Sequence, residues 1–194
     1  AVSGAACHYY GGGADLTDVL RAKYPGLAWH FTEGGPRLYE NYDTDWCKWG
    51  VTICHALNHG AKSFTGWNLL LDETGAPNIG PFFCGGLITL NSQSGELSYS
   101  GQYRALARFA PVIDRGKSIY PCKVHDAGAI ETSRYPALEL PCAATASVNQ
   151  KSGAVALFYV NPTKVKKQVT FDLRGNTVYF EALPDSLTTV RIEE

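Results

Sequence analysis

The first half of the chain alternates between strand-type and helix-type patterns, and this alternation limits the folds that it can adopt. Short apolar runs such as "LAWHFT" are followed by segments whose apolar residues recur at helical spacing. Strand, helix, strand, helix is the order typical of parallel β/α units, because parallel strands need a long crossover between them. We expect strands over 3–10, 27–32 and 62–71, and helices over 14–26, 43–60 and 100–109.

The second of these helices carries signals at both of its ends. Asp43 or Thr44 is expected to cap its start, and Gly60 is a natural stop. One face of the helix is apolar and is therefore expected to point into the core. The residues of this face are Trp46, Trp49, Ile53 and Leu57.

The pattern changes after residue 117. Short runs rich in Val, Thr and aromatic residues are separated by turns that contain Gly, Asn, Pro and Asp, which predicts an antiparallel sheet and a small β-sandwich. The expected organisation is therefore α/β followed by all-β, with parallel β/α units in 1–116 and the sandwich in 117–194. The β runs lie at 154–161, 167–173, 176–182 and 187–193.

The composition is that of a folded protein and excludes several classes of partner. Hydrophobic residues make up 45% of the 194 residues and charged residues 18%, which excludes a disordered chain. A formal net charge of −1 gives no reason to expect nucleic acid or an anionic membrane as a partner. No run reaches about 18 consecutive apolar residues, so no transmembrane segment is expected. The first residues also lack the basic and apolar regions of a signal peptide.

Six cysteines, an even number, leave two interpretations open. Cys47 and Cys54 share one expected helix and lie about 10 Å apart along its axis, too far to bridge each other. If disulfides form, both cysteines pair elsewhere and the protein is secreted. Otherwise the cysteines are buried free thiols. Their positions are 7, 47, 54, 84, 122 and 142.

The sequence gives little support for a metal site. No Cys-x-x-Cys motif is present. His55 and His59 are four residues apart on an expected helix, a spacing that can bind a metal, but the sequence shows no third ligand. We expect neither a metal nor another cofactor.

The ends of the three expected parallel strands carry the residues best suited to chemistry. Carboxyl ends of parallel strands form the working face of β/α folds. One strand ends at Glu33, followed by Gly34-Gly35, and the other two end at His8 to Tyr10 and at Trp67-Asn68. Aromatic rings with a few polar groups suit a pyranose ring, and a carboxylate can attack its anomeric carbon. The alternative is that Glu33 is an exposed turn residue and that the rings, like His30, belong to the core.

The segment from residue 8 to about 110 resembles glycoside hydrolase family 30, which includes glucosylceramidases, fungal β-1,6-glucanases and β-1,6-galactanases. Several motifs in the same order carry the resemblance, and the end of the chain resembles the closing strand of that family. The motifs are "CHYYGG", "YPGLAWHFTEGG", "GWNLLLDETGAPN", "FFCGGLITLN", "SGELSYSGQYRALARFAP" and "LPDSLTTVRI".

This resemblance implies a fold and a role for each of the strand-end residues. The family fold is a (β/α)8 TIM barrel with a side β-sandwich, and 1–116 would be the last three β/α units, strands six to eight. Family members are retaining β-glycosidases with two catalytic glutamates. Glu33 matches the nucleophile, and its two glycines would let the chain turn away tightly. The implied substrate-binding residues are His8, Tyr10, Trp67 and Asn68.

The chain departs from the family in one respect that decides its activity. The family's acid/base glutamate lies at the end of strand four, usually after Asn, whereas this sequence has no Asn-Glu dipeptide and no counterpart of strands one to five. Glu40, Glu73 and Glu96 do not match that position. Retaining hydrolysis needs both carboxyl groups, so the chain alone is expected to be inactive or very weak.

Two functions follow from this departure. In the first, the chain is the C-terminal portion of a retaining β-glycosidase, and a partner that supplies the missing N-terminal barrel portion, or a second copy, completes it. In the second, the chain is a non-catalytic, lectin-like or defence-type protein that binds carbohydrate. Both functions imply a β-glycoside ligand and a secreted, extracellular protein, and the identity of the sugar stays open.

Overall fold

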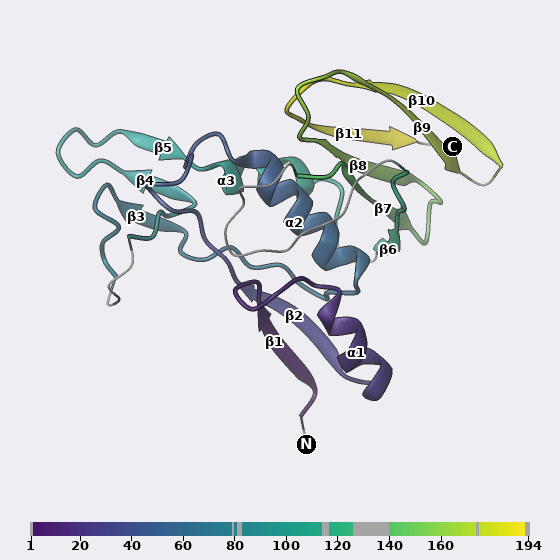
Figure 1. Ribbon diagram of the computed structural model, residues 1–194, viewed down its shortest axis with the longest axis horizontal. Helices are drawn as coiled ribbons and strands as arrows, with labels where there is room; N and C mark the ends of the chain where they lie inside the picture. The colour runs from purple at the N-terminus through teal and green to yellow at the C-terminus, as the bar shows by residue number, and fades with distance from the viewer. Residues whose placement is uncertain are drawn as a thin grey trace.

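The computed structural model describes residues 2–78, 80, 83–113, 117–125, 140–173 and 175–192. Parallel strands, helices and an antiparallel sandwich follow one another along the chain, as the sequence predicts (Figure 1). The elements are β1 (Gly4–His8), α1 (Leu16–Lys23), β2 (Ala28–Glu33), α2 (Trp46–Asn58), β3 (Leu70–Asp72), β4 (Ile88–Leu90), β5 (Leu97–Tyr99), α3 (Gly101–Phe109), β6 (Lys117–Pro121), β7 (Ala143–Asn149), β8 (Val155–Asn161), β9 (Lys167–Leu173), β10 (Asn176–Ala182) and β11 (Ser186–Ile192).

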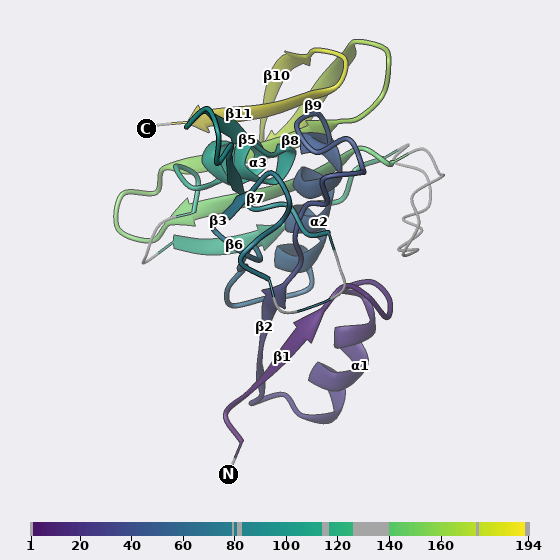
Figure 2. The ribbon, with the colours of Figure 1, turned by 90° about the vertical axis from the view of Figure 1, so that its left-hand side faces the viewer.

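β1 and β2 form a parallel pair that is joined by α1. The ladder runs in register from Gly4 opposite Ala28, and it shifts at its end so that His8 lies opposite Glu33. Parallel pairing brings the carboxyl ends of both strands to one edge of the sheet. Figure 2 shows this pair with α1 at one end of the molecule and the β9–β10 hairpin at the other.

The expected third strand over 62–71 differs from the structure. Only a short segment runs beside β2: Lys62 N donates to Trp29 O at 2.9 Å, and Phe64 forms a parallel bridge with Phe31. The regular strand that follows, β3, starts at Leu70 and belongs to a different sheet. The prediction joined two elements because one apolar run covers both of them.

The second sheet is small and was predicted only in part. β3 pairs with β4 in parallel, and β4 pairs with β5 in antiparallel orientation. The β4–β5 turn follows from its sequence, since Asn91 Oδ1 accepts from Gln93 N at 3.0 Å and Gly95 has φ +74°. An Asx turn with a glycine in the left-handed region is typical of such a connection.

Helix α2 is the centre of the main hydrophobic core. Trp49 and Ile53 are buried together with Phe158 and Val160 of the β8 strand, so the helix lies on the four-stranded sheet. Of the expected apolar face, Leu57 is also buried, while Trp46 is partly buried and donates through Nε1 to Asp185 O at 3.0 Å.

The expected cap of this helix is wrong. Asp45, rather than Asp43 or Thr44, precedes α2, and it makes no side-chain capping bond. Its carboxylate instead accepts from Trp49 Nε1 at 2.9 Å, one turn into the helix. The buried indole therefore determines the position of this side chain.

The sandwich contains the four predicted β runs as β8 to β11. The four-stranded sheet has the order β11-β8-β7-β6, and all its neighbouring strands are antiparallel. Its face away from α2 packs against the β9–β10 hairpin, with Leu157 and Tyr159 on one side and Phe171 and Phe180 on the other. Alternating side chains of β8 thus contribute to two cores.

The six cysteines, all within the described ranges, are free thiols. The interpretation that they form disulfides therefore receives no support from the structure. Cys47, Cys54 and Cys142 are buried, as expected for the alternative.

None of the helices in the described ranges is long and apolar enough to cross a membrane.

Candidate active site

The carboxylate of Glu33 lies at the end of β2 between two side chains from the end of β1. Tyr10 donates its hydroxyl hydrogen to Glu33 Oε1 at 3.1 Å, and His8 Nε2 lies 3.5 Å from Glu33 Oε2. The Glu33 side chain is 28% exposed, so it is reachable from solvent but is held on two sides. Three of the five residues that the sequence singled out therefore meet, because the parallel register of β1 and β2 brings these strand ends together.

Tyr10 is a hydrogen-bond donor to this carboxylate at neutral pH. Burial raises the pKa of the Tyr10 phenol, and the hydrogen bond to Glu33 and the charge of Glu33 raise it further. The phenol therefore keeps its proton and orients Glu33 Oε1. Its ring lies edge-on to His8, with a centroid distance of 5.8 Å, so the two groups that contact Glu33 also contact each other.

The neighbouring ring of Tyr9 belongs to the core. Its centroid lies 6.2 Å from Phe31 and 5.9 Å from Trp49, and it is 4.8 Å from Tyr10. The alternative of core packing thus applies to Tyr9 but not to Tyr10 or His8. A continuous stack of rings connects the main core with the carboxylate.

The two glycines after Glu33 are needed for close packing. A Cβ at Gly34 would lie 2.8 Å from Phe31 Cζ and 3.0 Å from Tyr9 Cδ1, and one at Gly35 would lie 3.0 Å from Trp67 O. Neither glycine has a positive φ, so a tight turn is not the reason for them. The expected reason for these glycines was a tight turn. The structure shows that they are needed because neighbouring chain segments approach closely.

Trp67 and Asn68 are attached to the Glu33 loop through the backbone. Trp67 N donates to Gly34 O at 3.1 Å, and the Trp67 side chain is 44% exposed. Asn68 adopts φ +58°, a left-handed conformation that asparagine tolerates better than most residues. Its carbonyl accepts from Leu87 N at 2.9 Å. The segment that carries the two remaining predicted residues is thus connected to the residue after Glu33.

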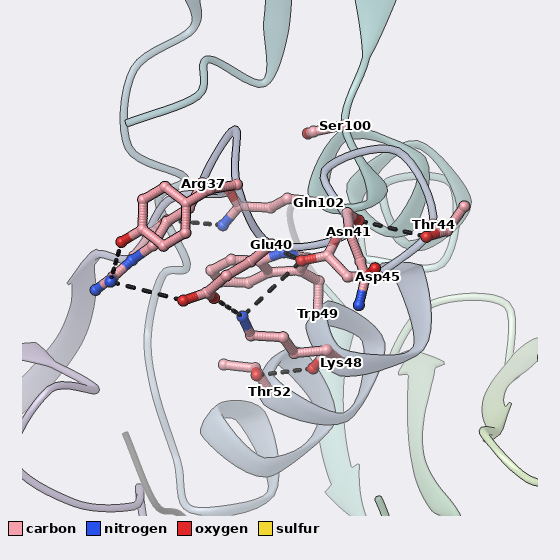
Figure 3. Close-up of polar contacts among 12 residues, drawn as sticks. Arg37, Glu40, Asn41, Thr44, Asp45, Lys48, Trp49, Thr52, Ser100 and Gln102 are labelled. Carbon is pink, nitrogen blue, oxygen red and sulfur yellow. Dashed lines mark hydrogen bonds and ion pairs between the residues drawn. The ribbon is translucent and has the colours of Figure 1, made fainter. Parts of the chain in front are cut away.

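A chain of charged groups connects the loop after Glu33 with the start of α2 (Figure 3). Glu40 Oε1 lies 3.7 Å from Arg37 Nη1, and Glu40 Oε2 lies 3.5 Å from Lys48 Nζ. Lys48 Nζ also lies 3.9 Å from Asp45 Oδ2. This network was not predicted from the sequence, although opposite charges three residues apart occur twice in it, at 37/40 and at 45/48.

The carboxyl group of Asp45 is strongly perturbed within this network. Burial raises its pKa from 3.8 to about 7, against the opposing effects of the Lys48 charge and the Trp49 hydrogen bond. Asp45 Oδ1 has no hydrogen-bond partner among the described residues. The carboxyl group is therefore partly protonated near neutral pH.

Among the described residues, Glu33 makes polar contacts with Tyr10 and His8. No second carboxyl group is among these contacts. Glu40 is engaged in the ion pairs described above, and Glu73 accepts from Ser92 N at 2.7 Å on the β3–β5 sheet. That neither of these glutamates is the acid/base stays a prediction.

The two histidines with metal-type spacing face aspartates of the first β/α unit. His55 Nε2 lies 3.3 Å from Asp15 Oδ1, and His59 Nδ1 lies 2.7 Å from Asp18 Oδ2. Within the described parts of the chain, no group of three or more His, Cys, Asp or Glu side chains is arranged to hold a metal ion. These pairs connect α1 to α2.

No protein-family model matches the chain. A curated relative, "Putative glucosylceramidase 3" of Caenorhabditis elegans, is 30% identical over 126 residues, which is 59% of this chain and 24% of that protein.

Solved structures share the fold over nearly the whole chain. An endo-β1,6-glucanase has a TM-score of 0.80 and 21% identity, with 99% of this chain and 41% of the glucanase covered. SrfJ from Salmonella typhimurium has a TM-score of 0.78 and 18% identity, with 99% and 41% covered. A glycoside hydrolase family 30 subfamily 8 xylanase from Clostridium acetobutylicum has a TM-score of 0.64 and 14% identity, with 97% and 48% covered.

These comparisons confirm the resemblance to glycoside hydrolase family 30. The chain has the fold of a part of these enzymes: it spans less than half the length of the three solved structures and about a quarter of the curated relative. The glucanase, the xylanase and the putative glucosylceramidase are glycosidases by name, which places the chain beside carbohydrate-active proteins.

Proposed function

We propose that the chain is the C-terminal portion of a retaining β-glycosidase and that Glu33 is its nucleophile. The observation that supports this proposal is the position of the Glu33 carboxylate, at a strand end and between Tyr10 and His8. A carboxylate that is held and oriented in this way can attack the anomeric carbon of a β-glycoside. The reaction needs no metal and no organic cofactor.

The proposed roles follow from the contacts of each residue. Tyr10 holds Glu33 Oε1, and His8 lies at Oε2, so both orient the attacking group. The exposed ring of Trp67 offers an apolar surface for a sugar ring, and Asn68 beside it offers an amide for hydroxyl groups. Attack by Glu33 forms a glycosyl ester and releases the leaving group.

A companion is needed for efficient turnover of ordinary glycosides. General acid catalysis contributes typically 10² to 10⁴-fold, and among the described residues no carboxyl group that could supply it contacts Glu33. Among the described strands β1 pairs with β2 alone, so its outer edge can accept another parallel strand. We propose that a polypeptide with the missing barrel portion, or a second copy, binds at this edge. Secretion remains a prediction.

Covalent trapping tests the nucleophile without requiring the missing acid. In 2-deoxy-2-fluoro-β-glycosyl fluorides, attack by Glu33 forms the C–O ester bond and breaks the C–F bond, and fluoride leaves without a proton. We would incubate the chain with the gluco, galacto and xylo forms and record its intact mass. One sugar per chain is expected.

Two variants control this experiment. Glu33→Gln removes the proposed nucleophile and is expected to abolish labelling, whereas Glu40→Gln changes a carboxylate seven positions further along and is expected to leave labelling in place. Equal labelling of wild type and Glu33→Gln would refute the assignment.

The contacts of Glu33 also favour a second candidate, a carbohydrate-binding protein without catalysis. It rests on the exposure of Trp67 and on the contacts of Glu33, which include no second carboxyl group among the described residues. Binding to a glycan array that is lost in Trp67→Ala, together with no trapping by any of the three fluorides, would select this candidate. Binding that is unchanged in Trp67→Ala would contradict it.

A further inference from the structure

The carbonyl group of Gly34, the residue directly after Glu33, accepts two hydrogen bonds from distant parts of the chain. Trp67 N donates to it at 3.1 Å, and Gln102 Nε2, on helix α3, donates to it at 2.7 Å. Figure 3 shows the Gln102 side chain reaching from α3 toward the loop that follows β2. One oxygen atom thus connects the strand end that carries Glu33, the segment that carries Trp67, and the last helix of the β/α part.

Gln102 is buried to an extent that is unusual for an amide side chain. Its exposure is 0%, and its Oε1 has no partner among the described residues. Burying a polar group without a partner is costly, so the Nε2 bond must offset part of that cost. The bond also determines the orientation of the amide, because the opposite orientation would place Oε1 against the Gly34 carbonyl oxygen.

The first turn of α3 is fixed in place by its surroundings. Ser100 Oγ caps the helix by accepting from Tyr103 N at 3.0 Å, and Gly101 N donates to Tyr42 O at 2.7 Å. A Cβ at Gly66 would lie 3.4 Å from Gln102 Cδ, so the chain just before Trp67 packs directly against this amide. Gln102 is therefore packed against the chain before Trp67 as well as bonded to Gly34.

We propose that Gln102 is a positioning residue that keeps Glu33 and Trp67 at a fixed separation for a β-glycoside bound between them. This inference rests on the proposed function for its consequence in catalysis. The link itself is defined by the two bonds to Gly34 O and can be tested separately. A displacement of about 1 Å in a reacting group can lower a rate about 100-fold, so loss of this link is expected to act on the rate of attack.

The test compares Gln102→Met with wild type. Methionine has nearly the shape of glutamine but cannot donate, so the variant removes the bond without opening a cavity. Gln168→Met is the matched control, because Gln168 makes its bond to Glu181 in the sandwich, at 3.1 Å. Two measurements are made on each protein: amide hydrogen exchange at Trp67, and the rate constant and half-saturation concentration for trapping by the 2-deoxy-2-fluoro-β-glycosyl fluorides.

We expect exchange at Trp67 to become at least 10-fold faster in Gln102→Met while β7 and β8 amides are unchanged. The trapping rate constant is expected to fall by about 10 to 100-fold, with a smaller change in half-saturation concentration. Gln102→Glu provides a rescue, since a protonated carboxyl group donates to Gly34 O and an ionised one does not. Its defects should diminish as the pH is lowered, whereas those of Gln102→Met should not.

The possible outcomes separate this inference from the proposed function. Unchanged Trp67 exchange in Gln102→Met overturns the positioning role, whatever the trapping shows. Faster exchange with an unchanged trapping rate also overturns it, because Gln102 would then be merely structural. If wild type is not trapped, the nucleophile proposal fails, and the exchange data with the pH rescue alone decide whether Gln102 links the two segments.

Discussion

At the scale of single residues, the proposed attack on a sugar depends on how Glu33 is held. Tyr10 donates to its carboxylate and His8 lies beside it, and two glycines after it allow Phe31 and Trp67 to approach closely. The sequence predicted that these strand ends share an edge, but not that Tyr10 and His8 contact Glu33. It could not predict the reason for the glycines, because close contact between distant segments leaves no periodic signal.

Removing the Tyr10 hydroxyl tests the orientation of Glu33. Tyr10→Phe keeps the ring but loses the bond to Glu33 Oε1, and a hydrogen bond to a charged group contributes about 1.5–3 kcal/mol. We expect trapping to slow by about 10-fold or more. Tyr179→Phe, at a residue that is 74% exposed in the sandwich, is the control and should react at the wild-type rate. Equal rates for all three proteins would show that Tyr10 does not orient Glu33.

Asp45 is expected to make folding stability depend on pH. Its pKa is raised from 3.8 to about 7, so between these values the folded chain keeps a proton that the unfolded chain has released. The contribution of this proton to the free energy of unfolding is therefore complete below about pH 4. It is lost as the pH rises toward about 7, at about 1.4 kcal/mol per pKa unit.

The measurement is the free energy of unfolding by urea at several pH values. The difference between Asp45→Asn and wild type should increase from pH 4 to pH 7 in favour of the variant, because asparagine can still accept from Trp49 and carries no charge. Asp43→Asn, at an exposed neighbour, should show no such trend. A constant difference for Asp45→Asn would mean that its carboxyl group has an ordinary pKa.

At the scale of elements, the helices and the strands β8 to β11 could be predicted, whereas β6, β7 and the short pairings were missed. The expected helices contain α1, α2 and α3, and the four β runs of the second half match β8 to β11. The segment beside β2 was merged with β3, because a single bridge between Phe64 and Phe31 leaves no signal in the pattern. Gln102 was missed because candidate residues were sought at strand ends, whereas Gln102 lies on a helix.

The N-terminal cap of α3 gives a prediction at this scale. Ser100 is 0% exposed and its Oγ accepts from Tyr103 N. Ser100→Ala should lower the free energy of unfolding by about 1 kcal/mol. Ser94→Ala is the control, because Ser94 accepts only a longer, exposed bond of 3.3 Å from Glu96 N. Equal stabilities of the two variants in urea unfolding would contradict the role of this cap.

At the scale of the whole molecule, one core joins the β/α part to the sandwich. Trp29 and Phe31 of β2, Trp49 and Ile53 of α2, and Phe158 of β8 belong to the same buried cluster. The part of the chain that resembles barrel strands is thereby supported by the sandwich. Its β1 edge is where the proposed companion would bind.

This shared core predicts a single cooperative unfolding transition. Phe158→Ala should destabilise the chain by about 3–5 kcal/mol, because the ring is fully buried and packs on Phe109 at a centroid distance of 4.3 Å. Tryptophan fluorescence reports the β/α part, where all four tryptophans lie, and far-UV circular dichroism reports the whole chain. Two separate unfolding transitions, of which Phe158→Ala shifts only one, would show that the two parts unfold independently.

The central claim is that Glu33 attacks a sugar, and peptide mapping of the trapped protein tests it most directly. Trypsin releases residues 24–37 as one peptide, "YPGLAWHFTEGGPR", in which Glu33 is the only carboxylate side chain. We expect this peptide to carry one 2-deoxy-2-fluoroglycosyl group, which fragmentation should locate on Glu33. A sugar found on any other residue, or on no residue with any of the three fluorides, would contradict it.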